Sequence, residues 1–291
     1  MRNDFCIFCL TYKRPDNMYT DRTLREAGYT GDIQYIVGDD DPTVGRYIEK
    51  YGADKVHVFN KAEVGKTFDT CDIEGSNKVI VYARNYCFTV AKRLGLKYFA
   101  QFDDDYDRFE YRFPVGEKLK TINVREFDQI VDLMIQLLDD TNALTCAFAQ
   151  NGDFLGGVQG DVTHNRMKRK AMNSFFCRTD RPFQFFGRIN EDVNTYCTLG
   201  SRGELFFSVV DVALHQKTTQ SNKGGMSDVY VDDGTYLKSF YTVMNCPSFV
   251  KIAAMGNTPE TRRIHHRVSW ETGVPKIISD KYRKTRDNDI P

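Results

Sequence analysis

The chain lacks the features of a membrane-bound or exported protein. Its 291 residues contain no run of eighteen apolar side chains, which is about the length that a membrane-spanning helix requires. The N-terminus, Met1 to Asp4, leads directly into an apolar strand pattern and shows no signal-peptide composition. We therefore expect a soluble, cytoplasmic protein that has no membrane partner.

A net charge is also missing, because 40 lysines and arginines balance 40 aspartates and glutamates. Any polyanionic partner must therefore bind to a local basic patch. Eight cysteines are scattered along the chain, mostly inside apolar runs, which is typical of reduced, buried thiols. Cys6 and Cys9 have zinc-like spacing, but they lie in an expected strand where their side chains point to opposite faces, so we expect no metal site there.

What the sequence does contain, in its first half, is the strand and helix alternation of a parallel α/β sheet. Apolar runs predict strands at residues 5–10, 33–37 and 56–59, and a further strand from about Tyr98 that carries Asp103. Helices are expected from Pro15 to Ala27, from Thr43 to Tyr51 and from Val79 to Leu94, and Gly28 and Gly95 are expected to stop the first and the last of them.

The second half is less regular. Its patterns predict helices over residues 124–138 and 191–199, and strands at 143–149, 175–177 and 205–214. The glycine-rich residues 152–161 are expected to form a loop. We interpret the chain as one α/β domain with a mixed, mainly parallel sheet and flanking helices. Its two halves are residues 1–110 and 111–275, and a basic tail, 276–291, follows them.

The most informative stretch runs from Tyr98 to Asp107, where an apolar strand ends in the carboxylates of Asp103, Asp104 and Asp105. Carboxylates this close repel one another unless a positive charge lies among them. A divalent cation is the usual solution, and oxygen ligands suit Mg²⁺ or Mn²⁺, which leave coordination positions open for substrate phosphates. The stretch therefore predicts a metal-dependent site for a phosphorylated substrate.

Two other expected strands end in polar segments, Thr11 to Arg14 and Gly38 to Asp41. Ligands of open α/β sheets bind beyond the carboxyl ends of the strands, so we expect these segments and the three aspartates to form one nucleotide-sized site. Asp39 or Asp40 would accept hydrogen bonds from a base or ribose, and Arg14 would contact phosphate. The alternative for any one acidic turn is that its side chains only interact with water at an exposed loop tip.

The polar segments from Thr11 to Pro15 and from Gly38 to Asp40, with Ala83-Arg84-Asn85 and the three aspartates, resemble the nucleotide-binding half of GT-A fold glycosyltransferases. The resemblance implies a Rossmann-like GT-A fold in which an Asp-x-Asp motif, here Asp103 and Asp105, binds the metal that bridges the diphosphate of a nucleotide sugar. The implied donor-binding residues are Thr11, Tyr12, Arg14, Asp39, Asp40, Arg84, Asp103 and Asp104.

Residues Gly187 to Asp192 resemble the Glu-Asp motif of the same family. In its inverting members, the acid of this motif opens the helix that lines the acceptor pocket and serves as general base. The resemblance assigns catalysis to Asp192 and its neighbour Glu191, with Asp192 deprotonating the acceptor hydroxyl while the metal offsets charge on the departing diphosphate. The alternative is structural, because acidic residues at a helix N-terminus complement the helix dipole.

His215 follows the expected strand 205–214. In the resembled family, a histidine at this place completes the metal shell, so the resemblance assigns His215 to the metal beside the two aspartates. His265 and His266 compete for that role. The polar segment from Gln216 to Gly225 is expected to form a mobile lid over the donor.

The C-terminal half, including Gly224 to Asp228 and Lys238 to Tyr241, also resembles bacteriophage glycosyltransferases that modify DNA bases. They include the group encoded beside TET-like dioxygenases and enzymes that transfer arabinose to 5-hydroxymethylcytosine. The resemblance implies transfer of a hexose or pentose to the hydroxymethyl group of a modified cytosine or uracil in phage DNA, in the host cytoplasm. Candidate DNA contacts are the basic clusters at 167–170, 262–267 and 281–286, and the aromatic residues within 182–186, on which a flipped base would stack.

Three alternatives stay open at this point. A GT-A enzyme of surface polysaccharide synthesis would use the same acids without DNA. Acidic clusters also serve two-metal nucleases and nucleotidyltransferases, although no second set of ligands for a metal pair is evident in the sequence. A nucleic-acid-binding module that kept the fold would need no catalytic acid. The sequence does not specify the sugar, the nucleotide or the oligomeric state.

Overall fold

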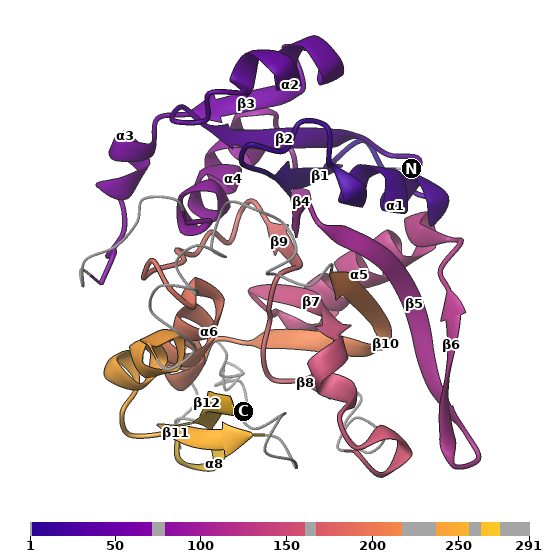
Figure 1. Cartoon of the computed structure of the whole chain (residues 1–291), viewed down its shortest axis with the longest axis vertical. Coiled ribbons are helices and arrows are strands. Elements are labelled where there is room, and N and C mark those ends of the chain that lie inside the picture. Colours follow the sequence, from indigo (N-terminus) through magenta and orange to yellow (C-terminus); the bar gives the residue numbers. More distant parts are fainter. Residues whose placement is uncertain (1, 72–78, 161–166, 217–236, 256–262, 274–291) are drawn as a thin grey trace, which may run out of the picture.

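The apolar run Phe5–Leu10 forms strand β1 at the centre of the first half of the sheet (Figure 1). All six of its side chains are buried, because parallel strands flank it and helices cover both faces. The computed structural model describes residues 2–71, 79–160, 167–216, 237–255 and 263–273, and the structural statements below concern these residues.

Ten strands of the described residues form one mixed sheet in the order β3-β2-β1-β4-β9-β7-β10-β5-β6, with β8 paired to β10. β1 lies between β2 and β4 in parallel, and β2 pairs in parallel with β3. The second half adds antiparallel strands, although β7 and β10 are parallel to each other. The bounds are β2 (Ile33–Gly38), β3 (Val56–Phe59), β4 (Tyr98–Asp103), β5 (Tyr106–Val115), β6 (Lys118–Asn123), β7 (Thr145–Gln150), β8 (Met167–Lys168), β9 (Phe175–Arg178) and β10 (Phe206–Gln216).

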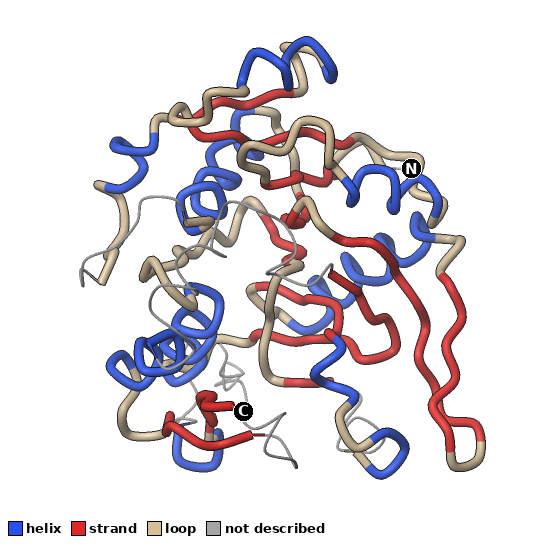
Figure 2. The backbone as a smooth tube through the Cα atoms, viewed as in Figure 1, coloured by secondary structure: helices blue, strands red, loops and turns tan. Residues whose placement is uncertain are grey.

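Helices lie against both faces of this sheet, and a separate hairpin of β11 (Val250–Met255) and β12 (Arg263–Val268) lies at the end of the described chain (Figure 2). None of the helices within the described residues has the length and apolar composition needed to cross a membrane. The helices are α1 (Tyr19–Glu26), α2 (Val44–Tyr51), α3 (Lys61–Gly65), α4 (Val81–Arg93), α5 (Phe127–Thr141), α6 (Glu191–Ser201), residues 237–245 and α8 (Trp270–Gly273), with short 3-10 turns η1 (Asn151–Phe154) and η2 (Gly157–Gln159).

The alternation of side chains along β1 assigns the helices to two cores. Phe5, Ile7 and Cys9 belong to a cluster that contains buried residues of α1, α2 and α5. The residues between them, Cys6, Phe8 and Leu10, belong to a second cluster with α4 and α6. Because β1 is central to both cores, its carboxyl end is fixed relative to helices on either side of the sheet.

The predicted fold class, an α/β sheet with flanking helices, is confirmed, and the structure reproduces strands 5–10 and 56–59 with their predicted bounds. The predicted strand that carries Asp103 is β4. The first helix begins at Tyr19 rather than at Pro15. Two side chains hold the preceding loop: Asp41 Oδ2 accepts from Lys13 N at 2.6 Å, and Tyr47 Oη accepts from Arg14 N at 2.7 Å. These tertiary contacts override the local helix signal of Pro15.

The β5 and β6 hairpin was not predicted from the sequence, and the predicted boundary at residue 110 falls inside β5. Most side chains of β6 are exposed, so the hairpin has no alternation of apolar and polar residues to reveal it. The predicted tail from residue 276 lies outside the described residues.

Two glycines after helices allow a matched test of local packing. Gly28 follows α1 with φ +89°, and a Cβ there would lie 2.0 Å from the backbone oxygen of Arg125. Gly95 follows α4 with φ +69°, and an added Cβ would meet nothing within 4 Å. Gly95→Ala therefore measures only the cost of placing an alanine in a left-handed backbone conformation. Gly28→Ala has the same cost and adds a clash between the new Cβ and the backbone of Arg125.

We expect Gly95→Ala to lower the free energy of unfolding by about 1 kcal/mol. We expect Gly28→Ala to lower it by about 2 kcal/mol more, because the carbonyl of Arg125 has to move. Urea denaturation of both variants measures the difference. Equal losses in the two variants would contradict the close approach of α1 to the start of α5.

Candidate active site

A cavity of about 350 Å³ opens beyond the carboxyl ends of β1 and β4. The segment after β1 contributes Thr11, Tyr12 and Arg14 to its lining, and the turn after β4 contributes all three aspartates. The start of α6 contributes Glu191 and Asp192, and α4 contributes Arg84. The structure thus brings together predicted site residues that lie as much as 181 positions apart in the sequence, from Thr11 to Asp192.

The turn that carries the aspartates is fixed by the first turn of α1. The hydroxyl of Thr20 donates to the backbone oxygen of Asp103 at 2.5 Å and accepts from the backbone nitrogen of Tyr106 at 2.9 Å. The backbone nitrogen of Thr20 donates to the oxygen of Asp104 at 3.2 Å. Thr20 is fully buried, so this short connection between β4 and β5 has little freedom.

Asp104 is directed away from its two neighbours and holds the loop after β1. Its Oδ2 accepts from Thr11 Oγ1 at 2.7 Å, and its Oδ1 accepts from Arg14 Nη1 at 2.8 Å. Burial raises the pKa of Asp104, and the neighbouring Arg14 partly offsets that rise. Asp104 therefore positions Thr11 and Arg14 at the cavity wall.

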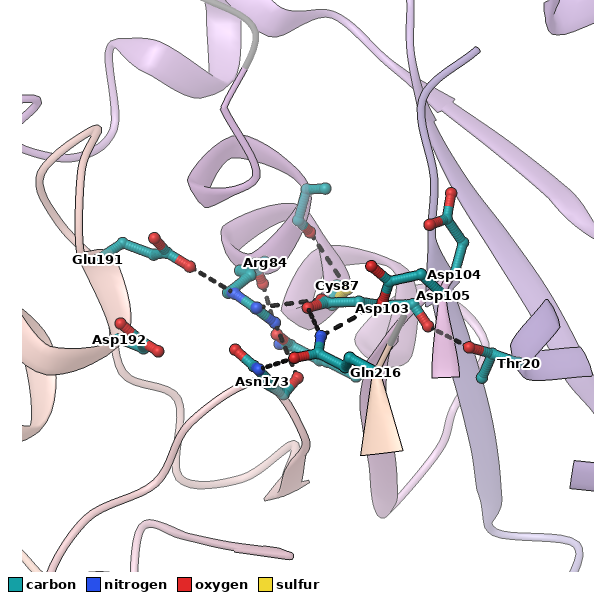
Figure 3. Close-up of polar contacts among 12 residues, drawn as sticks. Thr20, Arg84, Cys87, Asp103, Asp104, Asp105, Asn173, Glu191, Asp192 and Gln216 are labelled. Atoms are coloured by element: carbon teal, nitrogen blue, oxygen red, sulfur yellow. Dashed lines mark hydrogen bonds and ion pairs between the residues drawn. The ribbon is translucent and has the colours of Figure 1, made fainter. Parts of the chain in front are cut away.

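Arg84 lies between the two acidic parts of the cavity (Figure 3). Its Nε donates to Glu191 Oε1 at 2.9 Å, and its Nη2 donates to Asp103 Oδ1 at 3.1 Å. Its Nη1 donates to the backbone oxygen of Asn173 at 3.3 Å, and its guanidinium lies 4.8 Å from the centre of the Phe175 ring. Arg84 is only 1% exposed, so these contacts compensate the burial of a full positive charge.

The neighbour of Arg84 in the predicted Ala83-Arg84-Asn85 motif reinforces the same connection. Asn85 Nδ2 donates to the backbone oxygen of Phe185 at 2.8 Å, and Asn85 Oδ1 accepts from the backbone nitrogen of Phe185 at 2.8 Å. Asn85 thereby fixes the chain that leads into α6. The motif joins α4 to both the turn after β4 and the approach to α6.

Asp103 and Asp105 converge on one point. Gln216 Nε2 lies 3.3 Å from Asp103 Oδ2 and 3.3 Å from Asp105 Oδ1. Burial raises the pKa of Asp103 to about 6, against the opposing effect of Arg84. Burial, and then the charges of Asp103 and Asp104, raise the pKa of Asp105 to about 7. The two carboxylates are thus held together at a cost that a cation between them would relieve.

The donor set at this point fits a divalent cation of the hard, oxygen-binding kind. Two carboxylate oxygens converge there, and the cavity beside them has room for a phosphorylated ligand. Within the described ranges, however, no group of three or more His, Cys, Asp and Glu side chains is arranged to hold a metal ion. Among the residues that the structure describes, a third protein ligand of this site would therefore be a residue of another type.

Glu191 and Asp192 are the first two residues of α6, and each is only 7% exposed. Glu191 is directed to Arg84, whereas Asp192 Oδ1 accepts from the backbone nitrogen of Val193 at 2.7 Å. Burial, and then the charge of Glu191, raise the pKa of Asp192 to about 6, while Lys238 and Arg84 act in the opposite direction. Both acids lie in the first turn of α6, as the structural alternative of dipole-complementing acids also requires, so the catalytic role of Asp192 stays a prediction.

A directed chain of hydrogen bonds holds the start of α6. Asn194 Nδ2 donates to the backbone oxygen of Ile189 at 2.9 Å, which leaves Asn194 Oδ1 to accept from the hydroxyl of Thr242 at 2.8 Å. That hydroxyl in turn accepts from Asn190 Nδ2 at 2.7 Å. Asn190 precedes α6 with φ +59°, and the chain fixes its amide orientation.

Asp39 and Asp40 lie at the edge of the cavity, are exposed and do not line it. Asp40 Oδ2 accepts from Lys61 Nζ at 2.8 Å, and Asp39 Oδ1 accepts from the backbone nitrogen of Lys61 at 3.1 Å. Lys61 is 9% exposed and lines the cavity. The structure therefore shows these two acids holding a lysine, and their contact with a donor base or ribose stays a prediction.

The structure does not bring His215 to the aspartates. Its Nε2 lies 2.8 Å from Glu110 Oε1, and its Nδ1 lies 3.0 Å from Asn151 Nδ2. The next residue of β10, Gln216, faces Asp103 and Asp105 instead, because adjacent strand residues point in opposite directions. The expected lid from residue 217 onward lies outside the described residues.

The competing histidines also contact other groups. His265 Nδ1 lies 2.9 Å from the backbone oxygen of His266, and His266 Nδ1 lies 3.4 Å from Asn190 Nδ2. Burial lowers the pKa of His266 to about 3, so its ring is neutral beside α6. At the aspartates the structure shows the amide of Gln216, and a histidine on the metal stays a prediction.

Cavity residues that were not predicted as site residues include Lys61, Gln150, Asn173, Gln216 and Lys238. Lys61 follows β3 by two positions, so the rule that identified the other strand ends was sufficient to find it. Gln216 was assigned to the lid, because the sequence does not specify where β10 ends. Asn173 carries no sequence signal that we can identify, and Lys238 was noted only as part of the segment that resembles the phage enzymes.

A family model described as TET-Associated Glycosyltransferase matches residues 5–225 of the chain. A search of curated proteins found no match. Among solved structures, the chain is similar to glucosyl-3-phosphoglycerate synthase from Mycobacterium tuberculosis in complex with Mg²⁺ and UDP, with a TM-score of 0.46 and 9% identity over 91% of this chain and 87% of that one.

Two further solved structures are similar to the chain. One is S. aureus TarS in complex with UDP-GlcNAc, with a TM-score of 0.45 and 13% identity over 83% of this chain and 66% of that one. The other is the mannosyltransferase PcManGT from Pyrobaculum calidifontis in complex with GDP-Man and Mn²⁺, with a TM-score of 0.46 and 11% identity over 90% of this chain and 67% of that one.

The contacts of Arg84 predict that even a conservative substitution of this residue strongly lowers the free energy of unfolding. Arg84→Lys keeps the charge, but a lysine ammonium cannot reach Glu191, Asp103 and the oxygen of Asn173 together. We expect it to lower the free energy of unfolding by about 3 kcal/mol, because a buried carboxylate loses its partner. The matched control is Arg93→Lys at the exposed end of the same helix, which we expect to change it by less than about 0.5 kcal/mol. Similar changes in the two variants would contradict the bridging role.

The raised pKa of Asp192 predicts that the stability of the protein depends on pH. Its pKa is higher in the folded protein than in the unfolded chain, so its favourable contribution is present below the unfolded pKa near 4 and is lost as pH rises through about 6. We expect Asp192→Asn to be more stable than the wild type by about 2 to 3 kcal/mol above pH 7, and equally stable towards pH 4. Melting temperatures across this range test it, and a pH-independent difference would contradict it.

Proposed function

The chain belongs to the TET-associated glycosyltransferases, and from this premise we propose that it transfers a sugar from a nucleotide-diphosphate donor to the hydroxymethyl group of a modified pyrimidine in DNA. The observation that carries the proposal is the single cavity that contains Asp103 and Asp105 on one side and Asp192 on the other. In such a site, Asp103 and Asp105 would hold a diphosphate-binding cation at one end of the substrate, and Asp192 would act as general base at the other.

The donor side of the proposal uses the turn after β4 and the loop after β1. Asp103 and Asp105 would hold Mg²⁺ or Mn²⁺, which offsets charge on the diphosphate when it is bound. Asp104 keeps Thr11 and Arg14 at the wall, where Arg14 would contact phosphate. Lys61, buried at the same wall, is a further candidate for a phosphate or ribose contact.

The acceptor side uses the start of α6. Asp192 would accept the proton of the acceptor hydroxyl as that oxygen attacks the anomeric carbon, which inverts its configuration. The raised pKa of Asp192, about 6, suits a base that works near neutral pH. Glu191, held by Arg84, would position α6 and raise the basicity of its neighbour rather than take the proton itself.

DNA as the acceptor rests on the family and on the resemblance to phage enzymes of base modification. The basic cluster at 167–170 gives it little support, because Arg169 Nη2 donates to the backbone oxygen of Gly200 at 3.1 Å and Lys170 pairs with Asp153 at 2.5 Å. Phe183 and Phe185 are core residues, so they are not free to stack on a flipped base. The cluster at 281–286 lies outside the described residues.

A transfer assay with three DNA substrates tests the proposal. Duplexes that contain 5-hydroxymethylcytosine, 5-hydroxymethyluracil or only ordinary bases are incubated with Mn²⁺ and a panel of nucleotide sugars, and the nucleosides are analysed by mass spectrometry. We expect a sugar only on a hydroxymethylated base. Transfer to saccharide acceptors, with no product on any DNA, would instead support polysaccharide synthesis.

The same assay separates the roles of the acids. We expect Asp192→Asn to lower kcat by about 10³-fold and Asp105→Asn to raise the Mn²⁺ concentration that is needed. Asp107→Asn, an exposed acid two positions beyond Asp105, is the control and should retain wild-type activity. Wild-type kcat/KM should fall as pH drops below about 6, because Asp192 becomes protonated. Retained activity in Asp192→Asn would rule out this base.

A further inference from the structure

Gln216 occupies the point on which the two metal-assigned carboxylates converge (Figure 3). Its Nε2 is 3.3 Å from both Asp103 Oδ2 and Asp105 Oδ1. An amide nitrogen carries a partial positive charge and two hydrogens, so it satisfies both carboxylates in the way that a weak cation would. The side chain therefore marks the coordination point and also obstructs it.

We propose that Gln216 is the third protein ligand of the divalent cation, and that it presents its side-chain oxygen to the cation by reversing its amide together with the amide of Asn173. This inference rests on the metal-dependent function proposed above. It assigns to an amide the place that sequence resemblance had given to His215.

The contact between the two amides lowers the free-energy cost of the reversal. Asn173 Nδ2 donates to Gln216 Oε1 at 2.5 Å, while Gln216 Nε2 faces the carboxylates. If both amides turn by half a revolution, Gln216 Nε2 donates to Asn173 Oδ1 and the bond between the two side chains is kept. The same turn directs Gln216 Oε1 at the carboxylates, where three oxygens then converge.

The cation selects between the two arrangements. Without it, an oxygen facing two carboxylates would be repelled, and the arrangement with nitrogen inward is favoured. With it, the oxygen is attracted and a nitrogen is repelled, so the opposite arrangement is favoured. The cation thereby gains a ligand without the loss of the hydrogen bond between Asn173 and Gln216.

The backbone around both residues supports this role. Asn173 has φ +60°, in the left-handed region that asparagine adopts more readily than most residues, and its backbone oxygen accepts from the buried Arg84. The pairing of β10 with β5 shifts register between His215 and Gln216. Such irregularities re-aim side chains at the ends of strands, and here the shift accompanies the separation of His215, beside Glu110, from Gln216, beside the aspartates.

The amide of Gln216 also affects which metal the site prefers. A site of two carboxylates and one amide oxygen is composed only of hard oxygen donors, which suit Mg²⁺ and Mn²⁺ alike. An imidazole in place of the amide would shift the preference towards Mn²⁺. Gln216 is thus expected to determine which divalent ions the site accepts.

Mn²⁺ binding to the full chain, followed by electron paramagnetic resonance with and without UDP, tests the inference independently of turnover. We expect Gln216→Ala to weaken Mn²⁺ binding by about 10-fold or more, Gln216→Glu to retain it because an oxygen ligand remains, and His215→Ala to leave it within about 2-fold of the wild type. Gln216→His should raise the ratio of Mn²⁺ to Mg²⁺ affinity. In wild-type protein, ¹⁵N spectra should show the side-chain amides of Gln216 and Asn173 shifting together on addition of Mg²⁺.

The outcomes distinguish this inference from the function on which it rests. If the wild type binds no Mn²⁺ with or without UDP, both are overturned. If the wild type binds Mn²⁺ and Gln216→Ala binds it equally well, or if His215→Ala alone loses it, only the role of Gln216 is overturned. If Gln216→Ala fails to fold, the comparison of Gln216→Glu with the wild type and the amide spectra decide the question, and unmoved amide signals would contradict the reversal.

Discussion

The structure of the cavity depends on the positive charge of one buried side chain, Arg84. The guanidinium of Arg84 joins Asp103 at the end of β4 to Glu191 at the start of α6, and these two elements are 88 residues apart in sequence. Without that charge, the two carboxylates would repel each other across a poorly solvated space. Because α4 carries Arg84 and packs on the core face that β1 and α6 share, the arginine also fixes the distance between the two ends of the site. The Ala83-Arg84-Asn85 motif is best understood as this connection, since Asn85 secures the chain just before α6.

Arg84 stabilises only part of the acidic charge that it brings together. Asp104 is paired with Arg14, but Asp105 and Asp192 keep pKa values of about 7 and about 6 because burial and neighbouring carboxylates disfavour their charged forms. Residues in this condition are typical of functional sites, where the missing charge or proton arrives with a substrate. At the turn after β4, that charge is assigned here to a divalent cation and the donor diphosphate. At α6, we propose that it is the proton of an acceptor hydroxyl.

Much of this arrangement was predictable from the sequence, and the failures have physical causes. Strand ends were predictable because apolar runs stop abruptly before Thr11 and Asp103, and parallel strands bring those ends to one edge. His215 and Gln216 could not be distinguished, because a shift of one residue exchanges the faces of a strand and the register change at this place leaves no sequence signal. The loop before α1 was mistaken for helix, because side chains of Asp41 and Tyr47, distant in sequence, satisfy its backbone. Family resemblance supplied roles, but contacts decided which residue faces the aspartates.

We propose that the turn after β4 binds a divalent cation beside a nucleoside diphosphate. Anomalous diffraction at the manganese edge, from crystals grown with Mn²⁺ and UDP, measures it most directly. We expect a manganese peak between the carboxylates of Asp103 and Asp105, with the diphosphate in the cavity lined by Arg14. A bound diphosphate with no manganese at these carboxylates, or a nucleotide held elsewhere on the protein, would contradict it.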